Sequence, residues 1–262
     1  AVLGRANRMI AKRASALALT FAETEHADML PEDRHMMTGN PVRPEIRQHM
    51  GEAYRLPAEG EPLEILVIGG SQGARALSDV VPAALDRLSG RERSLIRLTQ
   101  QCRPEDLERV ELAYKALGFE AELKSFFDDL PARLAKAHLV ISRSGASSIS
   151  EMLVLGKPSI LIPLPYSLEG DQLANAKVVE AAGGAWLLEE AMLTGELLAD
   201  KIRLVLEKPE ILSEAAGKAR ALARPDAGEA LADALERIIP GFNTGGAAKS
   251  KGDGPGPLEE AA

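Results

Sequence analysis

From residue 63 onward, short apolar runs alternate with longer segments of helical periodicity, and this alternation limits the fold more than any other feature. The run "LEILVIGG" is continuously apolar, as expected for a strand covered on both faces. Similar runs begin near residues 94, 121, 138, 158 and 185, with helical segments between them. Strands alternating with helices predict parallel βαβ units with right-handed crossovers. We therefore expect an α/β fold, a Rossmann-like doubly wound parallel sheet, over residues 63–224.

The rest of the chain divides into four predicted parts. Residues 1–44 contain a basic helical stretch and two short strand-like runs, "ALALTFA" and "RHMMTG". Residues 45–62 form a predicted linker, because they are rich in Pro, Gly and charge. Residues 225–240 have helical periodicity, and residues 241–262 are rich in Gly, Pro and Ala, which predicts a disordered tail.

Charge and cysteine content exclude several classes of function. The formal net charge of −8 argues against a general nucleic-acid binder, which normally carries a basic excess. Cys102 is the single cysteine, so an internal disulfide is impossible and a reducing compartment is favoured. The histidines do not cluster at ligand spacing, so we expect no metal site; they stand at positions 26, 35, 49 and 138.

Open parallel sheets bind ligands outside the carboxyl ends of their strands, and three polar loops are expected there. The first is "GGSQGA", in which Gly69, Gly70 and Gly73 allow a tight turn and a close approach to a ligand. The helix that follows offers free N–H groups to a phosphate, and Ser71 adds a hydroxyl. The spacing matches neither GxxxxGK[ST] nor GxGxxG. A phosphate loop is expected here; a tight turn without a ligand is the alternative.

The second loop lies within "HLVISRSGASSISEML". Ser147 or Ser148 is expected to cap the helix that starts there. Glu151 follows in the early turns of the same helix, where it can accept hydrogen bonds from two adjacent hydroxyls, such as those of a ribose. The alternative is a carboxylate that is favoured there only by the helix dipole.

The third loop is "PLPYSLEGDQLANA". Gln172 and Asn175 are three residues apart and share a helical face. Side-chain amides offer both donors and acceptors, which suits a polyhydroxylated ligand. The alternative is that Asp171 merely caps the helix and that this face is solvated.

Taken in order, "TGNPVR", "GGSQGA", "FFDDL", "RSGASSISE" and "DQLANA" resemble the MurG family of glycosyltransferases over residues 1–240. The resemblance implies the GT-B arrangement of two Rossmann-like domains, of which this chain carries the C-terminal, donor-binding half. It implies transfer of N-acetylglucosamine from UDP-N-acetylglucosamine to a lipid-linked N-acetylmuramyl-pentapeptide in peptidoglycan biosynthesis. The site would need no cofactor and no metal. The enzyme would work peripherally at the cytoplasmic face of the bacterial inner membrane.

The resemblance also implies roles for individual residues. Ser71 would contact the donor diphosphate, Phe127 would lie beside the uracil through its backbone, and Glu151 would accept from the ribose. Gln172 and Asn175 would hold the sugar, and Arg43 would reach the site from the domain junction. The nucleotide would be lined by Ala146, Ser147, Ser148, Ile149 and Ser150.

The sequence departs from the family in its N-terminal part. The family has glycine-rich loops there, one ending in a histidine, which bind the acceptor and supply the base; nothing here matches them. We expect the chain to begin about two thirds of the way through that domain, and the catalytic residues stay unassigned. Two alternatives are a UDP-sugar-binding module that needs a partner half and a UDP-sugar 2-epimerase. The epimerase would require acidic and histidine residues for proton abstraction that we do not find.

The first helical stretch has two interpretations. It can touch an anionic membrane surface, or it can be an ordinary amphipathic helix that packs on protein. The residues concerned are the basic Arg5, Arg8, Lys12 and Arg13 and the apolar Leu3, Met9, Ile10 and Leu17.

Overall fold

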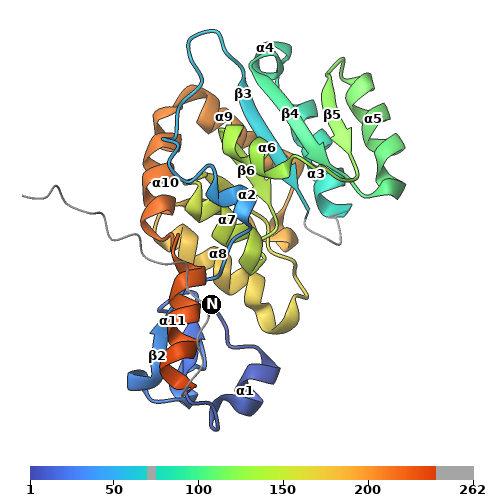
Figure 1. Cartoon of the computed structure of the whole chain (residues 1–262). Coiled ribbons are helices and arrows are strands. Elements are labelled where there is room, and N and C mark those ends of the chain that lie inside the picture. Colours follow the sequence, from blue (N-terminus) through green and yellow to red (C-terminus); the bar gives the residue numbers. More distant parts are fainter. Residues whose placement is uncertain (70–74, 240–262) are drawn as a thin grey trace, which may run out of the picture.

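The structure is a computed structural model that describes residues 1–69 and 75–239, and its central feature is a six-stranded parallel sheet (Figure 1). The strand order is β5-β4-β3-β6-β7-β8, and every neighbouring pair is parallel. This is the doubly wound arrangement predicted from the alternation of strands and helices. The strands are β3 (Leu63–Ile68), β4 (Ile96–Gln101), β5 (Ala121–Lys124), β6 (Leu139–Ser142), β7 (Ser159–Leu161) and β8 (Ala185–Leu187).

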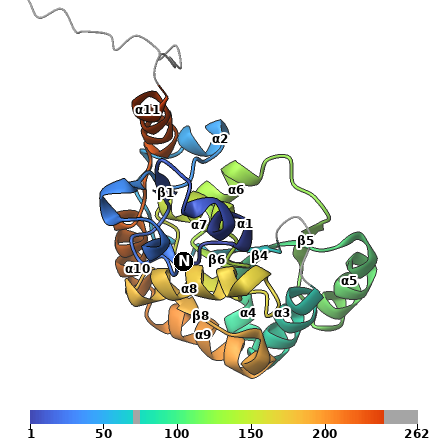
Figure 2. The same ribbon diagram turned by 90° about the horizontal axis from the view of Figure 1, so that it is seen from below.

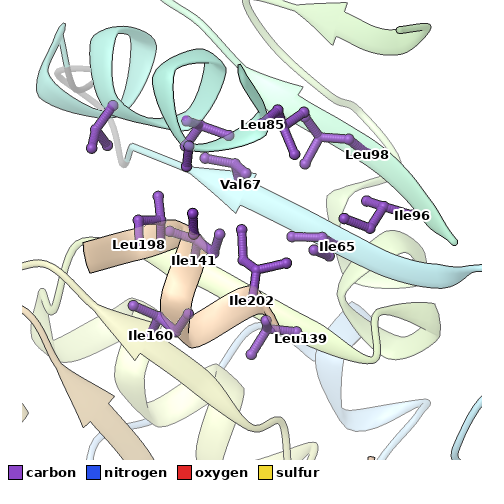
Figure 3. Packing of buried hydrophobic residues seen from close by; sticks show 14 of the residues in the cluster. Ile65, Val67, Leu85, Ile96, Leu98, Leu139, Ile141, Ile160, Leu198 and Ile202 are labelled. Carbon is purple, nitrogen blue, oxygen red and sulfur yellow. The ribbon is translucent and has the colours of Figure 1, made fainter. Parts of the chain in front are cut away.

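Helices cover both faces of this sheet at its centre, which is why β3, β6 and β7 are apolar and buried almost throughout. Towards one edge, β4 and β5 alternate between more buried and more exposed residues. Ile65, Val67 and Ile141 point to one face, where they pack with residues of α3, α5 and α9 (Figure 3). Leu66 and Val140 point to the other face, against α6, α7 and α8. The helices are α3 (Arg75–Arg87), α5 (Leu107–Ala116), α6 (Leu130–Lys136), α7 (Ala146–Val154), α8 (Asp171–Ala181), α9 (Gly195–Glu207) and α10 (Glu210–Ala221).

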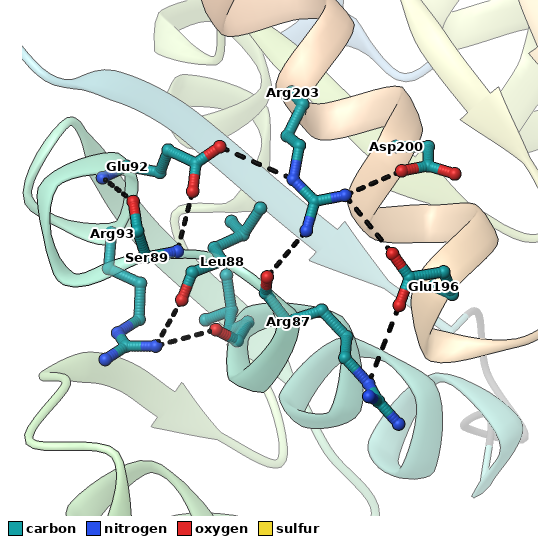
Figure 4. Close-up of polar contacts among 9 residues, drawn as sticks. Arg87, Leu88, Ser89, Glu92, Arg93, Glu196, Asp200 and Arg203 are labelled. Atoms are coloured by element: carbon teal, nitrogen blue, oxygen red, sulfur yellow. Dashed lines mark hydrogen bonds and ion pairs between the residues drawn. The ribbon is translucent and has the colours of Figure 1, made fainter.

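One short helix, α4 (Gly90–Ser94), was not expected from the periodicity. Ser89 and Glu92 close a capping box around its first turn, and this three-residue spacing is the signal that could have predicted it. Glu92 also lies 3.4 Å from the guanidinium of Arg203 on α9, which donates to the backbone oxygen of Arg87 at the end of α3 (Figure 4). These contacts fasten α3, α4 and α9 together on one face of the sheet.

Residues 1–47, here called the N-terminal segment, contain a second, two-stranded sheet. Its strands β1 (Leu17–Leu19) and β2 (His35–Met37) are parallel, in the two places where short strands were expected. Helix α1 (Arg5–Ala11) precedes them, and α2 (Pro44–Arg47) occupies the start of the predicted linker. In the view from below, the segment lies across the end of the large sheet near α7 and α8 (Figure 2). Short 3₁₀ turns complete the chain at Ala27–Met29, Glu32–Arg34, Pro104–Asp106, Leu168–Gly170 and Glu190–Met192.

The apolar stripe expected on the first helix is not formed as predicted. Leu3 lies before α1 and is buried beside the backbone contact between Val2 and Glu25, and Leu17 belongs to β1. The helix ends at Ala11, so a four-residue stripe would have required two more turns. Met9 and Ile10 are the large apolar residues that this helix exposes, at 78% and 63%.

The predicted linker is packed against the sheet domain, residues 63–224. Tyr54 donates a hydrogen bond from its hydroxyl to the backbone oxygen of His138, 2.9 Å away, and burial raises the pKa of this tyrosine. The ammonium of Lys157 lies 5.6 Å from the centre of the Tyr54 ring. His138 in turn accepts from the backbone N–H of Glu64 through Nδ1, at 2.9 Å, so this side chain joins the starts of β3 and β6.

The last described helix, α11 (Ala227–Ile238), returns to the N-terminal segment and begins beside Gly39 (Figure 1). Arg47 of α2 donates to Glu229 of α11 at 2.6 Å. Gly39 has a left-handed backbone, with φ of +79°, and a Cβ there would lie 2.4 Å from Cβ of Arg224. The predicted C-terminal helix is thus present, and it fastens the two ends of the described chain to each other.

Candidate functional site

The candidate site lies at the carboxyl ends of β3 and β6, where the chain order of the sheet reverses. Ile68 at the end of β3 pairs with Ser142 at the end of β6, so the loops that follow begin side by side. The crossover from β3 leads to β4 on one side, and the crossover from β6 leads to β7 on the other. Such a switch point is where open α/β sheets bind ligands.

The loop after β3 is only partly described. Gly69 is buried directly after the strand, whereas Gly70, Ser71 and Gly73 lie outside the described residues. The phosphate-loop role of "GGSQGA" therefore stays a prediction.

The loop after β6 is held rigidly. Arg143 is only 8% exposed, and its Nη1 donates to the backbone oxygens of Ile162 and Pro163 at 3.0 and 3.1 Å. The same nitrogen lies 2.6 Å from Glu190. Ser144 is fully buried and donates from Oγ to the backbone oxygen of Gln172 at 2.8 Å. We did not predict these roles; the only signal in the sequence is an arginine placed directly after a buried strand.

Helix α7 begins differently from the prediction. Its N-cap is Gly145 in an extended conformation, and neither Ser147 nor Ser148 caps it, because both already lie inside the first turn. The hydroxyl of Ser150 donates back to the carbonyl of Ala146 at 2.9 Å. Of the five residues predicted to line the nucleotide, Ala146 and Ser147 are exposed and Ser148 is partly exposed, whereas Ile149 and Ser150 are buried.

Glu151 lies in the second turn of α7 and is paired with Arg43 from the N-terminal segment. Arg43 donates from Nε to Oε1 at 2.6 Å and from Nη2 to Oε2 at 2.8 Å. This two-bond geometry is the strong form of a carboxylate–guanidinium pair, and it raises the pKa of Arg43. The structure therefore brings together two residues predicted to reach the same site, and it engages both oxygens of Glu151.

Gln172 and Asn175 both lie at the start of α8, as predicted, and both contact the neighbouring loops. Gln172 accepts through Oε1 from the backbone N–H of Leu164 at 3.0 Å, which leaves its NH₂ group as the available donor. Asn175 is buried and donates from Nδ2 to the backbone oxygen of Ser144 at 3.2 Å. The N-cap of α8 is Gly170 and not Asp171, which sequence analysis had considered for this role. The carboxylate of Asp171 accepts instead from the N–H of Gln172, at 2.7 Å.

Phe127 lies on the loop between β5 and α6 and is 4% exposed. The guanidinium carbon of Arg133 lies 4.4 Å from the centre of its ring, and Nζ of Lys124 lies 5.5 Å away. Its side chain is thus occupied, and contact with uracil through its backbone stays a prediction. The adjacent Phe126 is 68% exposed and was missed by sequence reasoning, although the doublet "FF" in a polar loop is a visible signal.

Two further features bear on the chemistry of the site. Within residues 1–69 and 75–239, His, Cys, Asp and Glu side chains form no group of three that could hold a metal ion. A hollow of about 530 Å³ lies at the opposite, amino edge of the sheet, lined by residues such as Glu64, Arg97, Arg133 and His138. Its two arginines are already paired with Glu64 and Glu122, and none of the described residues of the switch-point loops lines it, so we do not assign the donor site there.

Comparison with known proteins identifies the family of the chain. The family model of the glycosyltransferase family 28 C-terminal domain matches residues 64–238. A protein of Paramagnetospirillum magneticum named UDP-N-acetylglucosamine--N-acetylmuramyl-(pentapeptide) pyrophosphoryl-undecaprenol N-acetylglucosamine transferase is 48% identical over 92% of this chain and 65% of its own length. A Rhodospirillum rubrum protein of the same name is 46% identical over 89% of this chain and 59% of its own length.

A solved structure of the same family has a similar fold. The crystal structure of Acinetobacter baumannii MurG has a TM-score of 0.73 and 26% identity over 90% of this chain and 65% of that chain. The chain thus spans less than two thirds of each of these three relatives. The resemblance expected from the loop motifs is confirmed by these similarities.

Proposed function

The chain belongs to glycosyltransferase family 28, and from this membership we propose that it is the donor-binding half of a peptidoglycan enzyme. The enzyme would transfer N-acetylglucosamine from UDP-N-acetylglucosamine to lipid-linked N-acetylmuramyl-pentapeptide, as the name of the Paramagnetospirillum relative states for that protein. The observation that carries the proposal is the position of Glu151, a carboxylate beside the switch point of a doubly wound sheet.

Each part of the donor has a partner in this proposal. The ribose hydroxyls bind the carboxylate of Glu151, whose hydrogen bonds to Arg43 must be shared or exchanged. The sugar hydroxyls accept from the side-chain NH₂ of Gln172, beside Asn175. No side chain caps the start of α7, so its first backbone N–H groups can face the diphosphate. As UDP leaves, the negative charge on its diphosphate is stabilised by these fixed N–H groups and by the helix dipole.

Donor binding is proposed to need no metal, which calorimetry with UDP-N-acetylglucosamine in EDTA would test. Glu151→Gln should weaken binding by about 1.5–3 kcal/mol, since a charged acceptor is lost. The matched control is Glu214→Gln, which changes an exposed glutamate on α10 and should leave affinity unchanged. Binding that appears only with a divalent ion would contradict metal independence. A Glu151→Gln variant with normal affinity and a lower melting temperature would make Glu151 structural.

Contact with a membrane surface is also proposed, at its cytoplasmic face, because the acceptor is lipid-linked. Helix α1 presents Met9 and Ile10 to solvent, with Lys12 and Arg13 exposed directly after them. Apolar side chains flanked by basic ones suit the boundary of an anionic bilayer. Across the described part of the chain, no helix has the length and apolar character needed to cross a membrane.

A further inference from the structure

The segment between β7 and Gln172 folds back on itself through its own hydrogen bonds. Leu164 donates its N–H to Oε1 of Gln172, and the N–H of Gln172 lies 3.3 Å from Oγ of Ser167. Ser167 donates its N–H to the carbonyl of Leu164 at 3.1 Å, and Gly170 donates to the carbonyl of Ser167 at 3.0 Å. The direction of the Gln172 amide therefore depends on the conformation of residues 164–170, here called the α8 loop.

The α8 loop contains two consecutive residues with left-handed backbone. Gly170 adopts φ of +72° without cost, but Glu169 adopts φ of +59° and ψ of 22°. For a residue with a Cβ, this conformation costs roughly 1–2 kcal/mol. Glutamate is an unfavourable choice there unless its side chain makes a compensating contact.

That contact comes from the N-terminal segment. Arg8 on α1 donates from Nη2 to Oε1 of Glu169, and Nε of Arg5 lies 3.5 Å from the same oxygen. The side chains of Arg8 and Glu169 are 28% and 19% exposed, so this pair is better shielded from solvent than most ion pairs on the surface. Arg5 is 85% exposed and contributes less.

We propose that the Arg8–Glu169 ion pair is a positioning contact through which the N-terminal segment sets the α8 loop and so aims Gln172 at the donor's sugar. This inference rests on the proposed function, in which Gln172 binds the sugar. The pair would act on affinity for the sugar half of the donor and not on affinity for the nucleotide half. The reason is that α8 itself is anchored separately, through Asn175 and Ser144.

The test compares the dissociation constants of UDP and UDP-N-acetylglucosamine for the 262-residue chain, for Arg8→Met, for Glu169→Gln and for the double variant. Each single variant should bind UDP-N-acetylglucosamine about fivefold more weakly, which is the effect expected from the loss of a partly shielded ion pair. The affinity for UDP should stay unchanged. The double variant should lose no more than either single one. Arg13→Met, an exposed arginine on the same segment, is the matched control and should change neither constant.

A second measurement does not depend on ligand. Backbone amides of the α8 loop should exchange hydrogen faster in Arg8→Met and Glu169→Gln than in the unaltered chain, and at the normal rate in Arg13→Met. Equal losses for UDP and UDP-N-acetylglucosamine, additive losses in the double variant, or unchanged exchange would overturn the inference. If the unaltered chain bound neither ligand, the proposed function would fail, whereas the exchange rates would still decide whether the pair holds the loop.

Discussion

Arg43 and Glu151 are 108 positions apart in the sequence, yet their side chains form one two-bond ion pair. Both had been predicted to reach the donor site, but their contact with each other could not be predicted, because it depends on how the N-terminal segment docks. The pair occupies both carboxylate oxygens that a ribose would use. Nucleotide binding and the docking of Arg43 are therefore expected to compete.

Arg43→Met should separate these two effects. Uridine, which has no phosphate to attract Arg43, should bind severalfold more tightly, because both oxygens of Glu151 become available. The free energy of unfolding should fall by about 1–3 kcal/mol, since a mostly buried carboxylate loses its partners. Calorimetry and urea unfolding measure the two quantities. Arg47→Met removes the neighbouring exposed pair with Glu229 and should leave uridine affinity unchanged. Weaker uridine binding by Arg43→Met would contradict competition.

Lys157 gives a prediction about pH. It is 7% exposed, and burial lowers its pKa from 10.5 to about 8. Below pH 8 the folded and the unfolded chain both carry the proton; between pH 8 and 10.5 only the unfolded chain does. The free energy of unfolding should therefore rise with pH across that window, by up to roughly 3 kcal/mol relative to Lys157→Met.

Urea unfolding at several pH values between 7 and 10.5 would measure this slope. Lys136→Met, at an exposed position on α6, controls for the general loss of a lysine. Its free energy of unfolding should change with pH in the same way as that of the unaltered chain. A constant difference between Lys157→Met and the unaltered chain across the window would show the prediction to be wrong.

At the scale of elements, the order of strands and helices in the sheet domain was predictable because the central strands β3, β6 and β7 are covered on both faces and are therefore apolar almost throughout. The cap of α7 was not, because Gly145, Ser147 and Ser148 are all acceptable cap residues, and only the path of the preceding loop chooses among them. The packing of the predicted linker was also missed. Its anchor is Tyr54, whose partner is a backbone oxygen that no sequence pattern reveals.

The contact between α11 and the "TGNPVR" motif gives a prediction at this scale. Gly39→Ala should lower the free energy of unfolding by more than about 2 kcal/mol, because it adds a left-handed backbone cost to an overlap with Arg224. Gly60 is the matched control: its φ is +84°, but nothing lies within 4 Å of an added Cβ, so Gly60→Ala should cost only about 1 kcal/mol. Equal losses of unfolding free energy in the two variants would show that Arg224 moves aside without a measurable cost.

For the whole molecule, the proposed membrane contact can be tested by sedimentation with anionic vesicles at physiological salt. Lys12→Gln/Arg13→Gln should reduce the bound fraction, since each basic residue near such a surface contributes about 1 kcal/mol. Met9→Ser/Ile10→Ser should reduce it through the loss of buried apolar area. Met192→Ser, at another exposed apolar position, is the control. Unchanged sedimentation of both double variants would remove α1 as the contact.

The return of α11 has a mechanical consequence. Residues 38–43 connect β2 to α2, which packs on α6 and α7 of the sheet domain, and residues 222–226 connect α10 to α11. Gly39 and Arg224 place these two connections against each other. A single connection would allow the N-terminal segment to rotate about any axis relative to the sheet domain. Two adjacent connections allow rotation about the line that joins them and resist rotation about other axes. Opening and closing over a donor would then follow one angular coordinate, along which Arg8 approaches Glu169.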